Sequence, residues 1–264
     1  MFNRSGLMRY FIEFSYLGKA YCGWQRQSEA PSVQQTLEQG LSTLLREKIE
    51  VVGAGRTDTG VNASYYVAHF DTAREMCDCD KLVYKLNCIL PEDIAIGTLR
   101  AVADDAHARF SAVEREYSYF ISPVKNPFTR HLSWQYYVEL DVEAMNQAAE
   151  ELLCFEDFTT FAKLNSNNKT NICHVTHAEW KQVGHELRFT IRADRFLRNM
   201  VRAIVGTLVD VGRGRYTPKE FREILHAKNL SLSSGGAPAE GLFLSDVRYP
   251  EELFSRVWQG SQRV

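Results

Sequence analysis

The chain has 264 residues, a formal net charge of −2, 45% apolar residues and 24% charged residues, which is typical of a soluble globular protein with one large or two smaller domains. The near-neutral charge argues against a uniformly basic nucleic-acid binder, and no apolar run approaches the roughly 20 residues of a membrane span. There is no signal-peptide pattern, and six cysteines without a CxxC pair indicate reduced thiols, so we expect a cytoplasmic protein.

The first part of the chain mixes strand and helix patterns. Residues 7–16 are rich in aromatic and β-branched side chains and predict a strand. Ser32 opens a capping-box pattern before apolar residues at helical spacing, which predicts a helix. Further patterns predict strands at 49–52, 64–70 and 94–99 and a short helix at 81–88.

The second part of the chain also contains both strand and helix patterns. Patterns predict strands at 116–122 and 134–140, a helix at 141–153, a hairpin of 173–180 with 186–193, a helix at 196–211 and a closing strand at 242–247. Thr217 and Pro218 mark a further helix start, because proline suits the first helical position.

The order of these elements predicts the fold class. Neither half shows the regular alternation that gives a parallel sheet, so we predict an α+β fold with largely antiparallel pairing. We expect an N-terminal half, 1–105, and a C-terminal half, 106–264, which share one mixed sheet with a central cleft between them.

One loop of small residues presents a single carboxylate. Residues 53–61 read GAGRTDTGV and place Asp58 between an arginine and a glycine, after one strand pattern and before the next. Glycines let a bulky ligand approach the backbone closely, and loops held by a scaffold often carry chemistry. Asp58 is therefore a candidate catalytic residue. The alternative is a tight turn in which Asp58 bonds its own backbone.

Two other kinds of site fit the sequence less well. The Asp-Thr-Gly triplet also occurs in aspartic proteases, but those need two aspartates that share a proton, and this chain has one copy, which only a dimer would double. Arg56 beside the acid would hold it ionised and oppose a shared proton. Cys173, His174 and His177 lack a second pair of ligands, so we predict no metal site.

Basic residues gather in one segment. Residues 192–222 carry eight bases against three acids, whereas 71–105 carry eight acids against four bases. A localised positive surface suits a polyanion, although a solvated helix face is the alternative. Arg198 and Arg202 stand four apart on the predicted helix and should point the same way. Because the neighbours of Arg202 are apolar, we expect its guanidinium to have a carboxylate or phosphate partner.

The most specific pattern consists of six short segments spread over nearly the whole chain. They read YCGWQRQ at 21–27, GRTDTGV at 55–61, HARFSA at 107–112, REY at 115–117, FLRNMVRAIVG at 196–206 and EGL at 240–242. In this order they resemble the TruA family of tRNA pseudouridine synthases. The resemblance implies the pseudouridine synthase fold and isomerisation of uridine to pseudouridine at positions 38, 39 and 40 of the tRNA anticodon stem-loop. It also implies a homodimer without a metal or organic cofactor.

The resemblance assigns catalytic roles to three residues. Asp58 matches the catalytic aspartate, Tyr117 the active-site tyrosine and Arg202 the arginine paired with the aspartate. Tyr117 and Tyr119 are two apart on their strand and therefore share one face. We expect Tyr119 to pack in the core and Tyr117 to stack on the everted uracil.

Other residues are expected to bind the RNA. Arg56 matches the arginine associated with displacing the target base, and we assign Arg26 and Arg198 to tRNA contacts. The family commonly reads DAGVH where this chain has DTGVN, so Thr59 and Asn62 are departures beside the catalytic residue. Neither removes a group that the chemistry requires. An RNA-binding module without catalysis is the remaining alternative.

Overall fold

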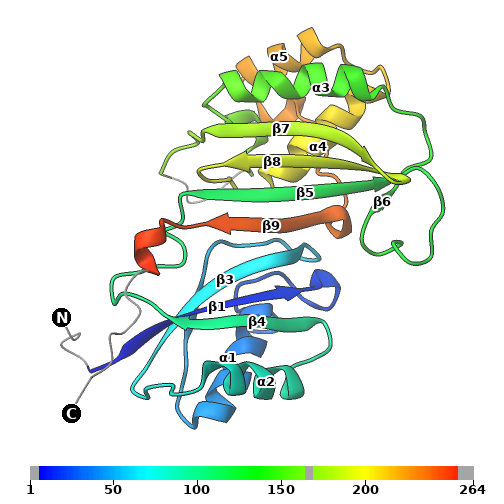
Figure 1. Cartoon of the computed structure of the whole chain (residues 1–264). Helices are drawn as coiled ribbons and strands as arrows, with labels where there is room; N and C mark the ends of the chain where they lie inside the picture. The colour runs from blue at the N-terminus through cyan, green and yellow to red at the C-terminus, as the bar shows by residue number, and fades with distance from the viewer. Residues whose placement is uncertain (1–5, 164–168, 255–264) are drawn as a thin grey trace.

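The computed structural model describes residues 6–163 and 169–254, and its core is one mixed sheet (Figure 1). The main strand order is β4-β1-β3-β9-β5-β8-β7, with short β2 beside β3 and short β6 beside β5. Antiparallel pairing dominates, as predicted, and the α+β fold class is confirmed. The bounds are β1 Met8–Tyr16, β2 Val51–Gly53, β3 Asn62–Thr72, β4 Ile94–Ala101, β5 Glu114–Ser122, β6 Trp134–Gln135, β7 Val175–Val183, β8 Glu186–Ala193 and β9 Leu242–Arg248.

Two helices pack on the N-terminal strands. They are α1 Val33–Leu45 and α2 Cys79–Ile89, below β4 and β1 in Figure 1. The side chain of Ser32 accepts a hydrogen bond from the amide of Gln35, which confirms the predicted helix start. The buried side chains of α1 recur at helical spacing, so its apolar stripe faces the sheet.

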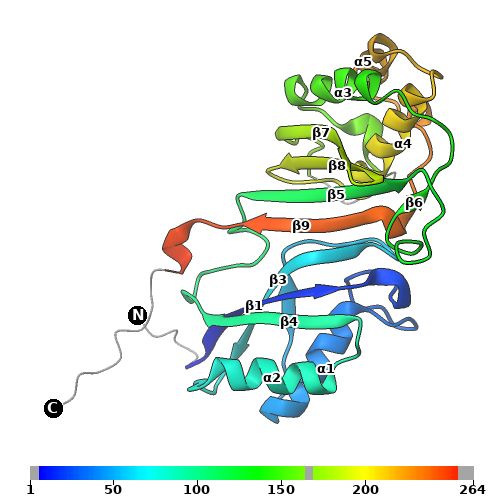
Figure 2. The ribbon, with the colours of Figure 1, turned by 45° about the vertical axis from the view of Figure 1, so that its right-hand side comes forward.

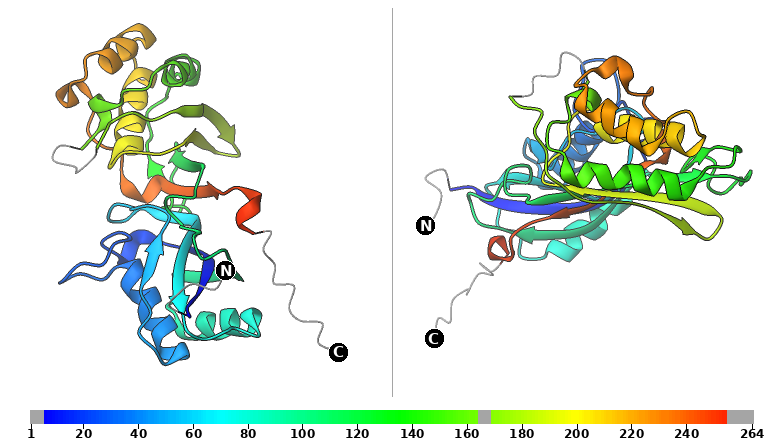
Figure 3. Two further views of the ribbon diagram at one scale, coloured as in Figure 1. Left: turned by 90° about the vertical axis from the view of Figure 1, so that its left-hand side faces the viewer. Right: turned by 90° about the horizontal axis from the view of Figure 1, so that it is seen from above.

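Three helices accompany the C-terminal strands. They are α3 Val142–Glu150, α4 Met200–Gly212 and α5 Pro218–His226. The predicted start of α5 is confirmed, because Thr217 and Glu220 form a reciprocal capping box before Pro218. Figure 3 shows α4 on one side of β7 and β8.

The last strand joins the two halves. In Figure 2, β9 runs between β3 and β5. It pairs antiparallel with β5, and it pairs parallel with β3 where Asn62 faces Phe243 and Ala63 faces Leu244. Two apolar clusters flank this junction, and Tyr119, fully buried as predicted, belongs to the C-terminal one. The division at residue 105 stays a prediction.

Two predicted elements are wrong in extent. The helix predicted from 196 begins only at Met200, because Asn199 takes a left-handed backbone conformation (φ 64°) that ends the preceding turn. The strand predicted over 134–140 is limited to Trp134–Gln135, and beyond it Tyr137 is 63% exposed. Arg198 therefore lies in a turn before α4 and does not share a helix face with Arg202.

Candidate active site

The Asp58 loop crosses the junction of the two halves. It leaves β2 after Gly53 and returns to the sheet at the start of β3, where β3 meets β9. The amide of Val61 donates to the carbonyl of Asp58 (3.1 Å), and Gly60 between them has a positive φ of 77°. The Asp58 side chain remains 24% exposed, so the carboxylate is open to a ligand.

A second loop packs tightly against the first. The amide of Trp24 donates to the carbonyl of Thr57 (3.3 Å). A Cβ atom on Gly23 would lie 2.4 Å from that carbonyl oxygen, and Gly23 has a φ of +86°. Only glycine allows both the conformation and the approach, so the YCGWQRQ segment buttresses the residue next to Asp58.

Two buried tyrosines support the loop from below. The hydroxyl of Tyr16 lies 2.8 Å from the Thr57 hydroxyl, and the hydroxyl of Tyr66 donates to the carbonyl of Gly55. The ring of Trp24 stacks on Tyr66 with centroids 4.5 Å apart. These contacts hold the residues on both sides of Arg56, Gly55 by its carbonyl and Thr57 by its hydroxyl. The sequence did not reveal them, since a tyrosine on a buried strand reads as ordinary core.

Asn62, one of the two departures, has a definite structural role. It is 2% exposed, its Oδ1 accepts from the amide of Gly18 (2.8 Å), and its Nδ2 donates to the carbonyl of Glu240 (2.9 Å). Asn62 thus joins three segments of the junction. Thr59, the other departure, is exposed.

The ion pair on Asp58 comes from Arg198. The Arg198 Nε lies 3.3 Å from the Asp58 Oδ1, and the Arg198 side chain is 60% exposed. The turn ended by Asn199 aims Arg198 across the junction, at a loop 140 residues earlier. This differs from the expectation that Arg202 pairs with Asp58.

Arg202 instead holds a neighbouring loop. Its Nε donates to the carbonyl of Ala237 (2.6 Å), and its own carbonyl accepts from the Ala237 amide (3.0 Å). The same loop is fixed by Tyr119, whose hydroxyl donates to the carbonyl of Pro238 (2.8 Å). A Cβ on Gly206 would lie 2.4 Å from the Gly235 carbonyl oxygen, so the close approach of this loop to α4 requires glycine at position 206.

Tyr117 lies at the same site. Burial raises the pKa of Tyr117 to about 12; Arg115 opposes the increase and the negative charge of Asp58 adds to it. The Tyr117 ring meets Phe196 edge-on, with centroids 5.1 Å apart. Tyr117 pairs with Leu244 of β9, which also pairs with Ala63 of β3, so Tyr117 lies at the junction of the two halves, and its phenol is protonated at neutral pH.

The predicted RNA-contacting arginines differ in their surroundings. Arg56 is exposed beside Asp58. Arg26 forms an ion pair with Glu38, which is 5% exposed and also accepts from the amide of Val51 (3.0 Å). The Arg26 guanidinium therefore neutralises a buried carboxylate under the YCGWQRQ segment, and 46% of its side chain remains exposed.

The basic residues of 192–222 do not form one free surface. Arg192 pairs with Glu116, and both lie on the sheet face opposite Tyr117, because neighbours along β5 alternate between faces. Arg213 and Arg215 lie within 4 Å of Asp210. Clustering in the sequence therefore overstates the positive surface that the fold offers.

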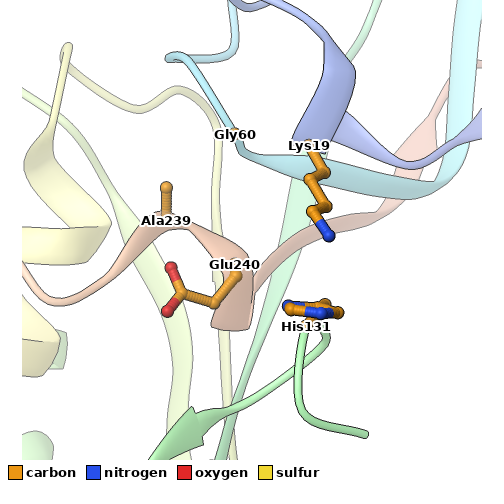
Figure 4. A pocket seen from close by; sticks show the side chains of 5 residues that line it. All are labelled: Lys19, Gly60, His131, Ala239 and Glu240. Carbon is orange, nitrogen blue, oxygen red and sulfur yellow. The ribbon is translucent and has the colours of Figure 1, made fainter. Parts of the chain in front are cut away.

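A hollow of about 220 Å³ lies beside the loop, past Gly60. Figure 4 shows the Lys19 ammonium directed toward the His131 ring and the Glu240 carboxylate on another wall. These charged residues are exposed, so the hollow is an open depression at the start of β9.

Some classes of site have no support in the described residues. Within 6–163 and 169–254, no three His, Cys, Asp or Glu side chains gather to hold a metal ion. Cys173 is buried, whereas His174 and His177 each lie 3.6 Å from a glutamate. In the same part of the chain, no helix has the length and apolar character needed to cross a bilayer.

Comparison with known proteins identifies close relatives. A family model described as tRNA pseudouridine synthase matches residues 13–111 and 148–250. A protein named tRNA pseudouridine synthase A from Bacteroides thetaiotaomicron is 50% identical over 94% of this chain and 93% of its own length. Proteins of the same name from Parabacteroides distasonis and Porphyromonas gingivalis are 49% and 46% identical, over 94% of this chain and 98% and 100% of theirs.

Proposed function

The chain belongs to the tRNA pseudouridine synthase family, and we propose that its Asp58 site isomerises uridine to pseudouridine at positions 38, 39 and 40 of the tRNA anticodon stem-loop. The observation that carries the proposal is a partly exposed carboxylate in a rigid loop, paired with a guanidinium from the other half, at the junction where Tyr117 also lies.

The reaction needs few protein groups. The N1–C1′ bond breaks, the uracil turns and C5 bonds to C1′; C5 then loses its proton and N1 gains one, so the product is an isomer of the substrate. Nothing is oxidised or consumed, so one carboxylate is sufficient, either as a nucleophile at the sugar or as the base that removes a sugar proton. Asp58 suits both roles, because its carboxylate is oriented by the ion pair with Arg198 and is accessible from solvent.

The two arginines of the FLRNMVR segment take different parts. Arg198 holds the Asp58 carboxylate and, being largely exposed, is also placed to meet the RNA backbone. Arg202 remains the catalytic arginine that the family resemblance implies. In this structure it positions the 233–241 loop, which reaches the catalytic loop through the Glu240–Asn62 hydrogen bond.

The target uridine must leave the stack to meet Asp58. Everting a base costs a few kcal/mol, and stacking on an aromatic ring recovers about 1–3 kcal/mol. Tyr117 supplies such a ring next to the carboxylate, and its phenol, held protonated, can donate a proton. Arg56, exposed beside Asp58, is placed to fill the space that the base leaves.

RNA binding is assigned to the exposed cations around this loop. Arg56, Arg198 and the exposed part of Arg26 contact phosphates, so affinity should fall as the salt concentration rises. A cytoplasmic homodimer is part of the same proposal.

The test is to incubate the wild-type protein with unmodified tRNA that carries tritium at C5 of uridine. Tritium release, with pseudouridine mapped to positions 38–40, supports the proposal. Binding without release would identify an RNA-binding module, and cleavage of a peptide substrate would indicate a protease.

A further inference from the structure

The turn 107–112 presents an aromatic ring to solvent. Phe110 is 75% exposed, and the guanidinium carbon of Arg109 lies 5.5 Å from the centre of its ring. An exposed aromatic ring and a guanidinium plane are two kinds of group on which unpaired RNA bases stack. The sequence analysis singled out this turn as the HARFSA segment, but the proposed chemistry does not use it.

The turn is held rigidly from beneath. The Ala108 amide donates to the His69 Nδ1 (3.1 Å), and the Tyr249 hydroxyl donates to the Ala108 carbonyl (2.6 Å). Burial lowers the pKa of His69 to about 4, so at neutral pH its ring is uncharged and keeps an acceptor nitrogen. The His107 ring packs against Phe110 with centroids 4.4 Å apart. The exposed ring is therefore oriented before any ligand arrives.

Arg115 places this turn beside the catalytic loop. Its guanidinium donates to the carbonyl of Arg109 and to the carbonyl of Ala54 (3.4 Å), at the start of the Asp58 loop. Arg115 and Tyr117 are two apart on β5 and share one face of the sheet. Phe110 thus follows directly after a residue that shares the Arg115 guanidinium with the start of the Asp58 loop.

We propose that Phe110 is a stacking platform for an unpaired base that neighbours the everted uridine in the RNA. Everting one base removes a stacking partner from its neighbours, and an aromatic ring fixed beside the site replaces that partner. The positive charge of Arg109 favours the phosphate backbone at the same place. This inference rests on the proposed function of the Asp58 site.

The experiment measures the affinity of a fluorescein-labelled anticodon stem-loop RNA for four proteins: wild type, Phe110→Ala, Phe110→Trp and Phe128→Ala. Phe128 is 88% exposed in another loop and is the matched control. Phe110→Ala should raise Kd roughly 5- to 150-fold, the range for one base–aromatic stack. Phe110→Trp should bind like the wild type, and Phe128→Ala should have no effect.

A set of stem-loop RNAs, each lacking one base, identifies the base that stacks on Phe110. When the base that stacks on Phe110 is missing, Phe110→Ala should no longer weaken binding. An unchanged Kd for Phe110→Ala, or the same loss with every RNA, would overturn the inference. So would a change in sedimentation that leaves RNA affinity intact, because the ring would then contact another protein copy. Wild type that forms no pseudouridine would instead count against the proposed function.

Discussion

Replacing Gly23 with alanine tests how far the reaction depends on the packing of the catalytic loop. The added Cβ would lie 2.4 Å from the carbonyl oxygen of Thr57 and 3.2 Å from the carbonyl carbon of Asp58. The left-handed conformation costs a non-glycine residue about 1–2 kcal/mol, and overpacking costs about 1–3 kcal/mol. We expect the free energy of unfolding to fall by roughly 2–5 kcal/mol.

Gly184→Ala is the matched control. Gly184 also has a positive φ, 61°, but a Cβ there would meet nothing within 4 Å. In Gly184→Ala the free energy of unfolding should fall only by the conformational cost of about 1–2 kcal/mol, and turnover should stay at the wild-type rate. Gly23→Ala should in addition lower turnover by up to about 100-fold, because it displaces the residue next to Asp58.

Denaturant unfolding and initial rates of tritium release measure both effects. If Gly23→Ala were as stable as Gly184→Ala and turned over like the wild type, the loop would not be held as the structure describes.

Four further predictions concern the contacts of the site and the sheet. Arg202→Met should lower turnover much more than tRNA affinity, because it releases the 233–241 loop; equal losses in both would contradict this role. Arg198→Met should change turnover by less than about 5-fold, since an exposed ion pair is worth ~0.2–1 kcal/mol; a loss of several hundred-fold would show that Arg198 acts in the chemistry. Tyr117→Phe should keep tRNA affinity, and because the pKa of Tyr117 is raised to about 12, wild-type rates should show no tyrosine ionisation between about pH 6 and pH 9. Asp71 accepts two hydrogen bonds from the guanidinium of Arg9, which lowers the pKa of Asp71. The ionised Asp71 therefore stabilises the fold above about pH 4, and this contribution is lost as the pH falls through the folded-state pKa. The unfolding midpoints of wild type and Asp71→Asn should accordingly converge at low pH.

The sequence predicted the elements whose causes are local. Ser32 and Thr217 mark helix starts because their side chains cap the backbone within three residues. The parallel pairing of Asn62 with Phe243 has no such signal, because it depends on packing between residues far apart in the chain. The late start of α4, after Asn199 and not at residue 196, is also a tertiary effect, since the local sequence favours helix there.

The site was predictable where the chemistry itself constrains residue types. Asp58 stood out because a charged residue among glycines is not needed for packing. Tyr16 and Tyr66 escaped notice, because only the folded chain shows that their hydroxyls reach the loop. The Arg26–Glu38 pair was missed for the same reason, and it changes the expected role of Arg26.

The central claim is that the Asp58 carboxylate performs the reaction, and Asp58→Asn tests it most directly. The substitution keeps the size of the side chain and removes the charge. We predict that the variant binds unmodified tRNA within a few-fold of the wild type and releases no tritium from C5-labelled uridine. Release of tritium by Asp58→Asn at a rate near that of the wild type would contradict the account.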